Sequence, residues 1–128
     1  MTRQHDSPEA RPEGGALNAA ISEALVRLLA ESTGRGATRA RTTIDRDLVV
    51  VVLQDSLTPG EQFLLDSDRG DQVLELRRAF QEAMTSDYVA TIEELTDRTV
   101  VAFMSANHID PDLAAEVFVL APEDAQRS

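Results

Sequence analysis

The sequence predicts an α+β domain in which an N-terminal helix, a β-hairpin, a helical pair and a second β-hairpin form a mostly antiparallel four-stranded sheet packed by helices. Three observations lead to this fold class. Apolar residues recur every three or four positions in two long stretches, which is the helical period. Two pairs of short, β-branched runs are each joined by turn-forming residues. The length of 128 residues, 42% of them apolar, suits one domain.

We divide the chain into three segments. Residues 1–15 mix charged residues with Pro and Gly, so they bury too little apolar surface to offset the entropy lost on ordering. We expect them to form a disordered leader. Residues 16–121 form the single α+β domain, and residues 122–128 form a flexible, polar tail.

The first helix and the first hairpin follow from periodicity. Apolar spacings of three and four predict a helix over residues 16–32, which ends before Gly34. Residues 38–45 alternate like a half-exposed strand, and a tight turn leads to the strand over residues 48–53. That strand is almost wholly β-branched and apolar on both faces. It should therefore be central in the sheet or covered by a partner subunit.

The helical pair begins with a capping signal. Thr58 and Glu61 have the spacing of a capping box, and Pro59 stands at the first helical position, where proline is best tolerated. A continuous apolar stripe then predicts a long helix over residues 71–96, which Thr85-Ser86-Asp87 could break. Arg77 flanks this stripe and would need a carboxylate partner if it were buried.

The second hairpin consists of strands over residues 99–106 and 115–121, joined by the turn-rich residues 107–112. These strands are also apolar on both faces. Because there are few helices to cover two apolar sheet faces, we expect a homodimer. The candidate interface residues are Val50, Val52, Phe103, Phe118 and Leu120.

Composition excludes several classes of function. A net charge of -11 argues against nucleic-acid binding, which depends on Lys and Arg that displace counterions from phosphates. The absence of cysteine excludes disulfides and thiolate chemistry. The amino terminus lacks the apolar core of a signal peptide, and the longest apolar run is too short to span a bilayer. We therefore expect a cytoplasmic protein without direct membrane insertion.

The densest positive patch surrounds two glycines. Gly34, Arg35 and Gly36, together with Arg39 and Arg41, could hold a small anion such as phosphate, a nucleotide or bicarbonate, because glycine amides converge and Arg offers paired donors. The simpler interpretation is a helix C-cap at Gly34 followed by a joint.

No metal, cofactor or catalytic site is predicted. The Asp66-x-Asp68-x-Gly70-Asp71 run departs from a calcium loop and is better explained as a turn in which Asp71 caps the next helix. Three residues of the second hairpin turn, His108, Asp110 and Asp112, are explained by turn formation. An acid/base pair from Glu93 or Glu116 with His108 is a further alternative, but the sequence does not bring these groups together. We interpret the glutamates as surface or interface groups.

Several short motifs occur in an order that resembles the MpsC-like family. They are Gly34-Arg35-Gly36, a strand over residues 47–52, Leu57-Thr58-x-x-Glu61, the helix with Arg77, Ile92-Glu93-x-Leu95-Thr96 and residues 116–120. The resemblance covers roughly residues 16–121. Ala37 and Asp97 depart from the family's usual Pro and Gly. The first change loosens the loop, whereas Asp97 tolerates the left-handed conformation that a helix end needs.

The family is named after a sodium-translocating system that generates a membrane potential. Since this sequence has no membrane span, the resemblance implies a soluble accessory or regulatory protein of a membrane system. We therefore expect a noncatalytic homodimer that acts through protein contacts. The alternative is an anion sensor that uses Arg35, Arg39 and Arg41.

Overall fold

The computed structural model describes residues 14–34 and 39–123. The predicted order of elements is confirmed, and the observed bounds are α1 Gly14–Thr33, β1 Arg39–Asp45, β2 Leu48–Gln54, α2 Pro59–Asp66, α3 Gly70–Thr96, β3 Val100–His108 and β4 Leu113–Leu120. The expected leader and tail fall mainly on residues 1–13 and 124–128, which lie outside the described residues, as do residues 35–38.

The four strands form one antiparallel sheet in the order β1-β2-β4-β3. Each predicted hairpin forms, and the two hairpins join through their second strands, so that β2 and β4 occupy the centre. The central position of β2 agrees with one of the two alternatives for this strand, which was expected to be central in the sheet or covered by a partner subunit.

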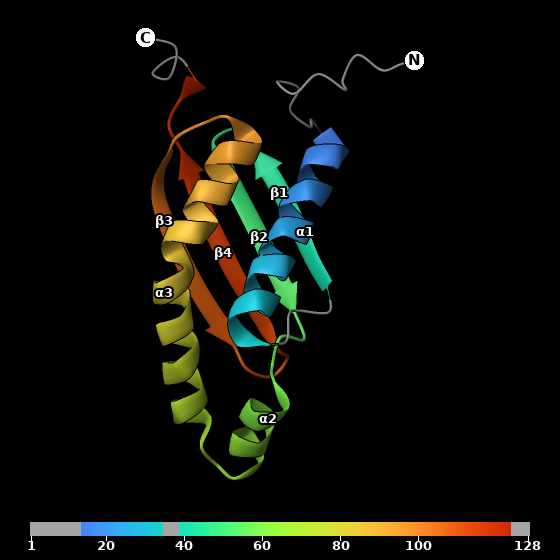
Figure 1. Ribbon diagram of the computed structural model, residues 1–128, viewed down its shortest axis with the longest axis vertical. Coiled ribbons are helices and arrows are strands. Elements are labelled where there is room, and N and C mark those ends of the chain that lie inside the picture. Colours follow the sequence, from blue (N-terminus) through green and yellow to red (C-terminus); the bar gives the residue numbers. More distant parts are fainter. Residues whose placement is uncertain (1–13, 35–38, 124–128) are drawn as a thin grey trace.

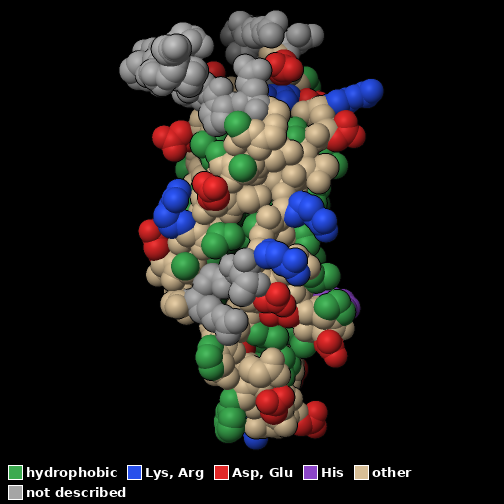
Figure 2. All heavy atoms as spheres, turned by 90° about the vertical axis from the view of Figure 1, so that its right-hand side faces the viewer, with side chains coloured by type: hydrophobic (Ala, Val, Ile, Leu, Met, Phe, Trp, Pro, Cys, Tyr) green, Lys and Arg blue, Asp and Glu red, His purple; other side chains and the backbone are tan. Residues whose placement is uncertain are grey.

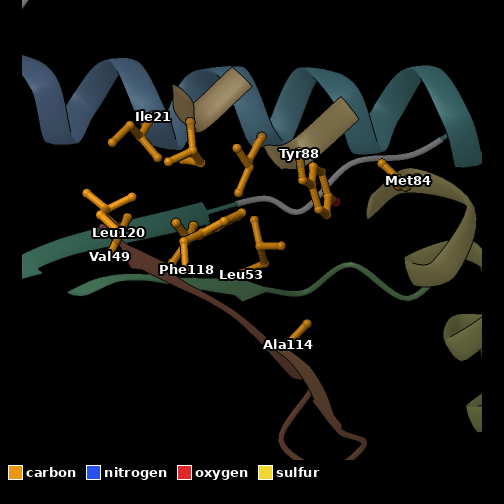
Figure 3. Close-up of a cluster of buried hydrophobic side chains, with 11 residues drawn as sticks. Ile21, Val49, Leu53, Met84, Tyr88, Ala114, Phe118 and Leu120 are labelled. Atoms are coloured by element: carbon orange, nitrogen blue, oxygen red, sulfur yellow. The ribbon is translucent and has the colours of Figure 1, made fainter. Parts of the chain in front are cut away.

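Two helices cover one face of the sheet. Figure 1 shows α1 and α3 side by side on the same face, with α2 beyond the end of the strands. The core lies between these helices and the sheet, where Ile21 of α1, Tyr88 of α3, Val49 of β2 and Phe118 of β4 are at most 1% exposed (Figure 3). The arrangement has two layers, helices on one side and strands on the other.

Local sequence signals explain where the helices begin and end. The predicted capping box is confirmed, because the Thr58 hydroxyl accepts a hydrogen bond from the Glu61 amide and the Glu61 carboxylate accepts one from the Thr58 amide. Asp97 ends α3 in the left-handed conformation at φ 58°, as expected. Gly34 has φ 83°, and its amide donates a hydrogen bond to the Ala30 carbonyl. Both features agree with the interpretation of Gly34 as a helix C-cap.

Two local expectations are corrected, and the structure adds an irregularity in β3. Helix α3 is continuous through Thr85, whose hydroxyl donates to the Gln81 carbonyl one turn earlier. Asp71 does not cap α3, because the N-cap is Arg69 and no side chain caps this end. A bulge at Val101 shifts the register of β3, so its alternation changes face between Val100 and Phe103.

Candidate functional site

The face of the sheet opposite the helices carries apolar side chains that no described helix covers. We call it the open face. Its members follow from the strand register and from the alternation of buried and partly exposed positions. They are Leu48, Val50, Val52, Ala102, Met104, Ala106, Leu113, Ala115, Val117 and Val119.

The centre of the open face is formed by β2 and β4, where Val50 lies opposite Val117 in the register. Both are partly exposed, whereas Leu48 is 40% exposed and Met104 is 53% exposed. A soluble domain seldom presents a whole sheet face of this composition to water. The open face is therefore a candidate interaction surface.

The sheet divides the interface residues that the sequence suggested. Val50 and Val52 lie on the open face. Phe103, Phe118 and Leu120 instead point toward the helices, where the Phe103 and Phe118 rings lie 4.9 Å apart and Phe118 and Leu120 are buried in the core. The three core-facing residues are thus removed from the candidate interface. The parity of β4 assigns Phe118 and Leu120 to one face, but only the position of the helices shows which face is covered.

The candidate anion patch is only partly described. Arg39 and Arg41 lie on the edge strand β1, with exposed side chains and register partners Gln54 and Val52. Arg35 and Gly36 lie outside the described residues. Figure 2 shows basic side chains interspersed with acidic ones on the side of the molecule that it views. Gly34, the remaining member, ends α1.

The groups considered for acid/base chemistry do not meet. His108 points to the open face, where it is exposed and its Nδ1 lies 2.8 Å from the Pro111 carbonyl oxygen. Glu116 points to the helix-covered face. Glu93 lies near the opposite end of β3, where its carboxylate accepts a hydrogen bond from the Val100 amide at 2.9 Å. His108 therefore lies on the opposite face of the sheet from Glu116 and at the opposite end of β3 from Glu93.

Glu116 was considered from the sequence only as an acid/base partner of His108, and its burial was missed. It is 1% exposed, so its interpretation as a surface or interface group is wrong. Ser105 donates a hydrogen bond to its carboxylate, and Gln81 is a second partner. Burial raises the pKa of Glu116 to about 7, although both hydrogen bonds oppose this shift. Burial also raises the pKa of Tyr88, and the nearby Glu116 charge adds to that effect.

Neighbouring polar side chains extend the Glu116 site. The side-chain amides of Gln81 and Asn107 exchange two hydrogen bonds of 2.9 and 3.0 Å between α3 and β3. A cavity of about 40 Å³ adjoins Glu116, Gln81, Asn107 and Tyr88, with Met84 and other apolar side chains completing its wall. This volume is sufficient for one or two water-sized occupants.

Arg77 forms a second buried polar group at the same cavity. It is 7% exposed, and its Nη2 donates to Ser56 Oγ at 2.8 Å and to Asp112 Oδ1 at 3.3 Å. Glu61 Oε2 lies 3.8 Å from Arg77 Nε, which has no hydrogen-bond partner. The expectation that a buried Arg77 requires a carboxylate is thus confirmed. Arg78, the next residue, is exposed.

An open groove of about 880 Å³ lies between α2 and the turn of the second hairpin, and its lining includes Asp55, Leu57, Leu65, Asp66 and Asp110. Within the described residues no group of three or more His, Cys, Asp or Glu side chains is arranged to hold a metal ion. No described helix has both the length and the apolar character needed to cross a membrane.

Comparison with known families supports the resemblance seen in the sequence. The family model described as "Na+-translocating membrane potential-generating system (MpsC)" matches residues 13–122. Comparisons with curated proteins and with solved structures find no match. Because the family model covers most of the sequence, the chain belongs to the MpsC family.

Proposed function

We propose that this protein is a noncatalytic, cytoplasmic accessory or regulatory protein that acts as a homodimer and through protein contacts with a membrane ion-translocating system. The observation that carries the proposal is the open face, because its apolar side chains gain free energy when they leave water. The family description supports the connection with a membrane system.

The partner that best suits the open face is a second copy of this chain. Two such sheets can stack about 10 Å apart, with the Val50 and Val117 rows at the centre. The distance between neighbouring strands and the rise per residue along a strand give the open face of one copy an area of roughly 400 Å². A contact of this size suits a dimer that dissociates on dilution.

The charges at the edge of the open face support the same partner. Arg39 and Arg41 lie at one end of β1, and Asp45 lies at the other end. In such a dimer the two-fold axis lies in the interface plane and runs perpendicular to the strands. It places β1 against β1 of the second copy, and the two strands run in opposite directions. Each arginine end then meets an aspartate end, so the edge is complementary to itself.

The noncatalytic part of the proposal is supported by the distribution of titratable groups. His108 and Glu116 point to opposite faces of the sheet, so they cannot share a proton through one substrate. Glu93 contacts the backbone at the far end of β3. A turnover assay would contradict this part if the purified protein, free of contaminating activity, converted a substrate.

The anion-sensor alternative stays a prediction. Arg39 and Arg41 are exposed on β1, which keeps them available to an anion, and they also border the proposed dimer contact. If phosphate, a nucleotide or bicarbonate binds there, it raises the melting temperature of the wild type and not that of an Arg39→Ala, Arg41→Ala variant.

Light scattering across a dilution series tests the homodimer. The wild type is expected to approach twice its chain mass of 14.0 kDa at high concentration and to fall toward one chain on dilution. Val117→Arg places a charge at the centre of the open face, where a dry contact could not solvate it, so this variant is expected to stay monomeric.

Two controls separate dimer loss from misfolding. Phe63→Arg changes a residue of α2 that is 69% exposed and lies away from the open face, so it should leave the mass unchanged. Met104→Arg, at a more exposed position of the open face, serves if Val117→Arg unfolds by circular dichroism. A wild type that is monomeric at every concentration, or a Val117→Arg variant that folds and dimerises like the wild type, would overturn the homodimer.

A further inference from the structure

The proposed function makes no use of the buried polar groups on the helix-covered face. A core position that carries a carboxyl group loses the stabilisation of an apolar side chain, and burying the ionised form costs further free energy because the charge leaves water. Glu116 nevertheless occupies such a position between Ala114 and Phe118 on the inward side of β4. The cavity beside it is therefore a place to search for a ligand.

Several side chains that carry oxygen atoms line one part of the cavity or contact a lining residue, while apolar side chains such as Leu53 and Met84 form much of the remaining wall. Glu116 offers two carboxylate oxygens, and Ser105 offers a hydroxyl oxygen next to them. The amide oxygens of Gln81 and Asn107 each accept one hydrogen bond from the other amide, which leaves each oxygen a second lone pair. Tyr88 adds a buried phenol on the same side.

The charged groups around the cavity favour a positive ligand. From α3 come Arg77 and the neutral Tyr88, from α2 comes Glu61, and from β4 comes Glu116. The residues that α1 and β3 contribute, Leu29, Thr33 and Asn107, are uncharged. Arg77 already pairs with Asp112 at 3.3 Å and lies 3.8 Å from Glu61. An ionised Glu116 would thus have no cation of its own among these residues.

We propose that this cavity binds one small monovalent cation, which takes the place of the proton on the Glu116 carboxyl group. In the exchange the Glu116 O–H bond breaks, the proton leaves to solvent, and the cation binds the carboxylate formed. The charge of the site therefore does not change. The neutral oxygens of Ser105, Gln81 and Asn107 complete the contacts together with water.

Cavity size and ligand charge select this class of ion. A volume of about 40 Å³ admits a dehydrated alkali-metal ion with a water molecule and excludes organic amines with more than a few heavy atoms. A divalent ion ordinarily needs several carboxylates, and the described residues offer no group of three. One carboxylate among neutral oxygens matches a single positive charge.

Thermal unfolding of the full chain in different chloride salts tests the site. At about pH 8 and constant ionic strength, lithium, sodium or potassium is expected to raise the melting temperature of the wild type by several degrees relative to choline, which is too large for the cavity. Glu116→Gln has no carboxylate to bind the cation, so all four salts should give it one melting temperature. Glu94→Gln removes the same charge from an exposed position and should respond like the wild type.

Proton release gives a readout that needs no variant. Adding the preferred cation to the wild type in weakly buffered choline chloride near pH 7 is expected to release protons, because burial raises the pKa of Glu116 to about 7 and part of its carboxyl groups are then protonated. The proposal is overturned if all salts give the wild type the same melting temperature. It is equally overturned if Glu116→Gln keeps the cation response or no proton is released. None of these outcomes depends on the oligomeric state.

Discussion

Replacing Glu116 by Gln should make the chain more stable at alkaline pH, and the structure gives the size of the effect. In the folded chain burial raises the pKa of Glu116 from 4.5 to about 7, whereas the unfolded chain titrates near 4.5. Between these pH values the folded state holds more protons, so its stability is complete below about pH 4.5 and falls as the pH rises through about 7. The difference of about 2.5 pH units, at about 1.36 kcal/mol per unit, corresponds to about 3 kcal/mol.

Urea unfolding of the wild type and Glu116→Gln from about pH 4.5 to about pH 8 measures this loss. Glutamine has nearly the same shape and can still accept a hydrogen bond from Ser105, but it does not ionise. The two free energies of unfolding should be similar at the acid end. At the alkaline end the variant should be more stable by up to about 3 kcal/mol. Choline chloride as the only salt keeps the proposed cation site empty during the comparison.

The difference between the two proteins at each pH cancels the titration of all other groups. A difference that does not change with pH would refute the reasoning, because it would mean that Glu116 titrates alike in the folded and unfolded chains. A variant that is less stable at every pH would refute it too. Glu94→Gln, at an exposed position, should change the free energy of unfolding by less than about 0.5 kcal/mol.

Two further predictions concern the other buried polar groups. Arg77→Met leaves Asp112 and Glu61 without their cation and should lower the free energy of unfolding, measured in urea, by about 3 kcal/mol. Arg78→Met, at the exposed neighbouring position, should change this free energy by less than about 0.5 kcal/mol. Equal effects of the two substitutions would show that Arg77 is not paired with these carboxylates. Tyr88 is the only tyrosine of the chain, so near-ultraviolet absorbance reports its ionisation alone. Because burial raises its pKa, the phenolate should appear only as circular dichroism is lost at alkaline pH, and phenolate in a folded chain would contradict this.

Signals contained within one element were predictable from the sequence. The capping box of Thr58 and Glu61 depends on two residues three positions apart, and its hydrogen bonds form as expected. The left-handed cap at Asp97 was also predictable, because few residue types tolerate that conformation. The need of a buried Arg77 for a carboxylate followed from its charge, but its partners came from residues up to 35 positions away and could not be identified.

The buried carboxyl group was missed for a different reason. Glu116, Phe118 and Leu120 are two positions apart along β4, so the alternation of side chains in a strand assigns all three to one face. Both faces of β4 are apolar, and the sequence contains no local signal that distinguishes the face covered by helices. The same ambiguity placed Phe118 and Leu120 among the interface candidates, although they form the core.

The sequence by itself determined the α+β class, the order of the elements and most of their ends, because periodicity, capping and turn formation act between residues a few positions apart. Only the tertiary structure decided the strand order β1-β2-β4-β3 and the face on which α1 and α3 pack. Those choices depend on contacts between distant segments. They leave the Val50 and Val117 rows in the open and enclose Glu116 beside a cavity, and both proposals follow from that difference.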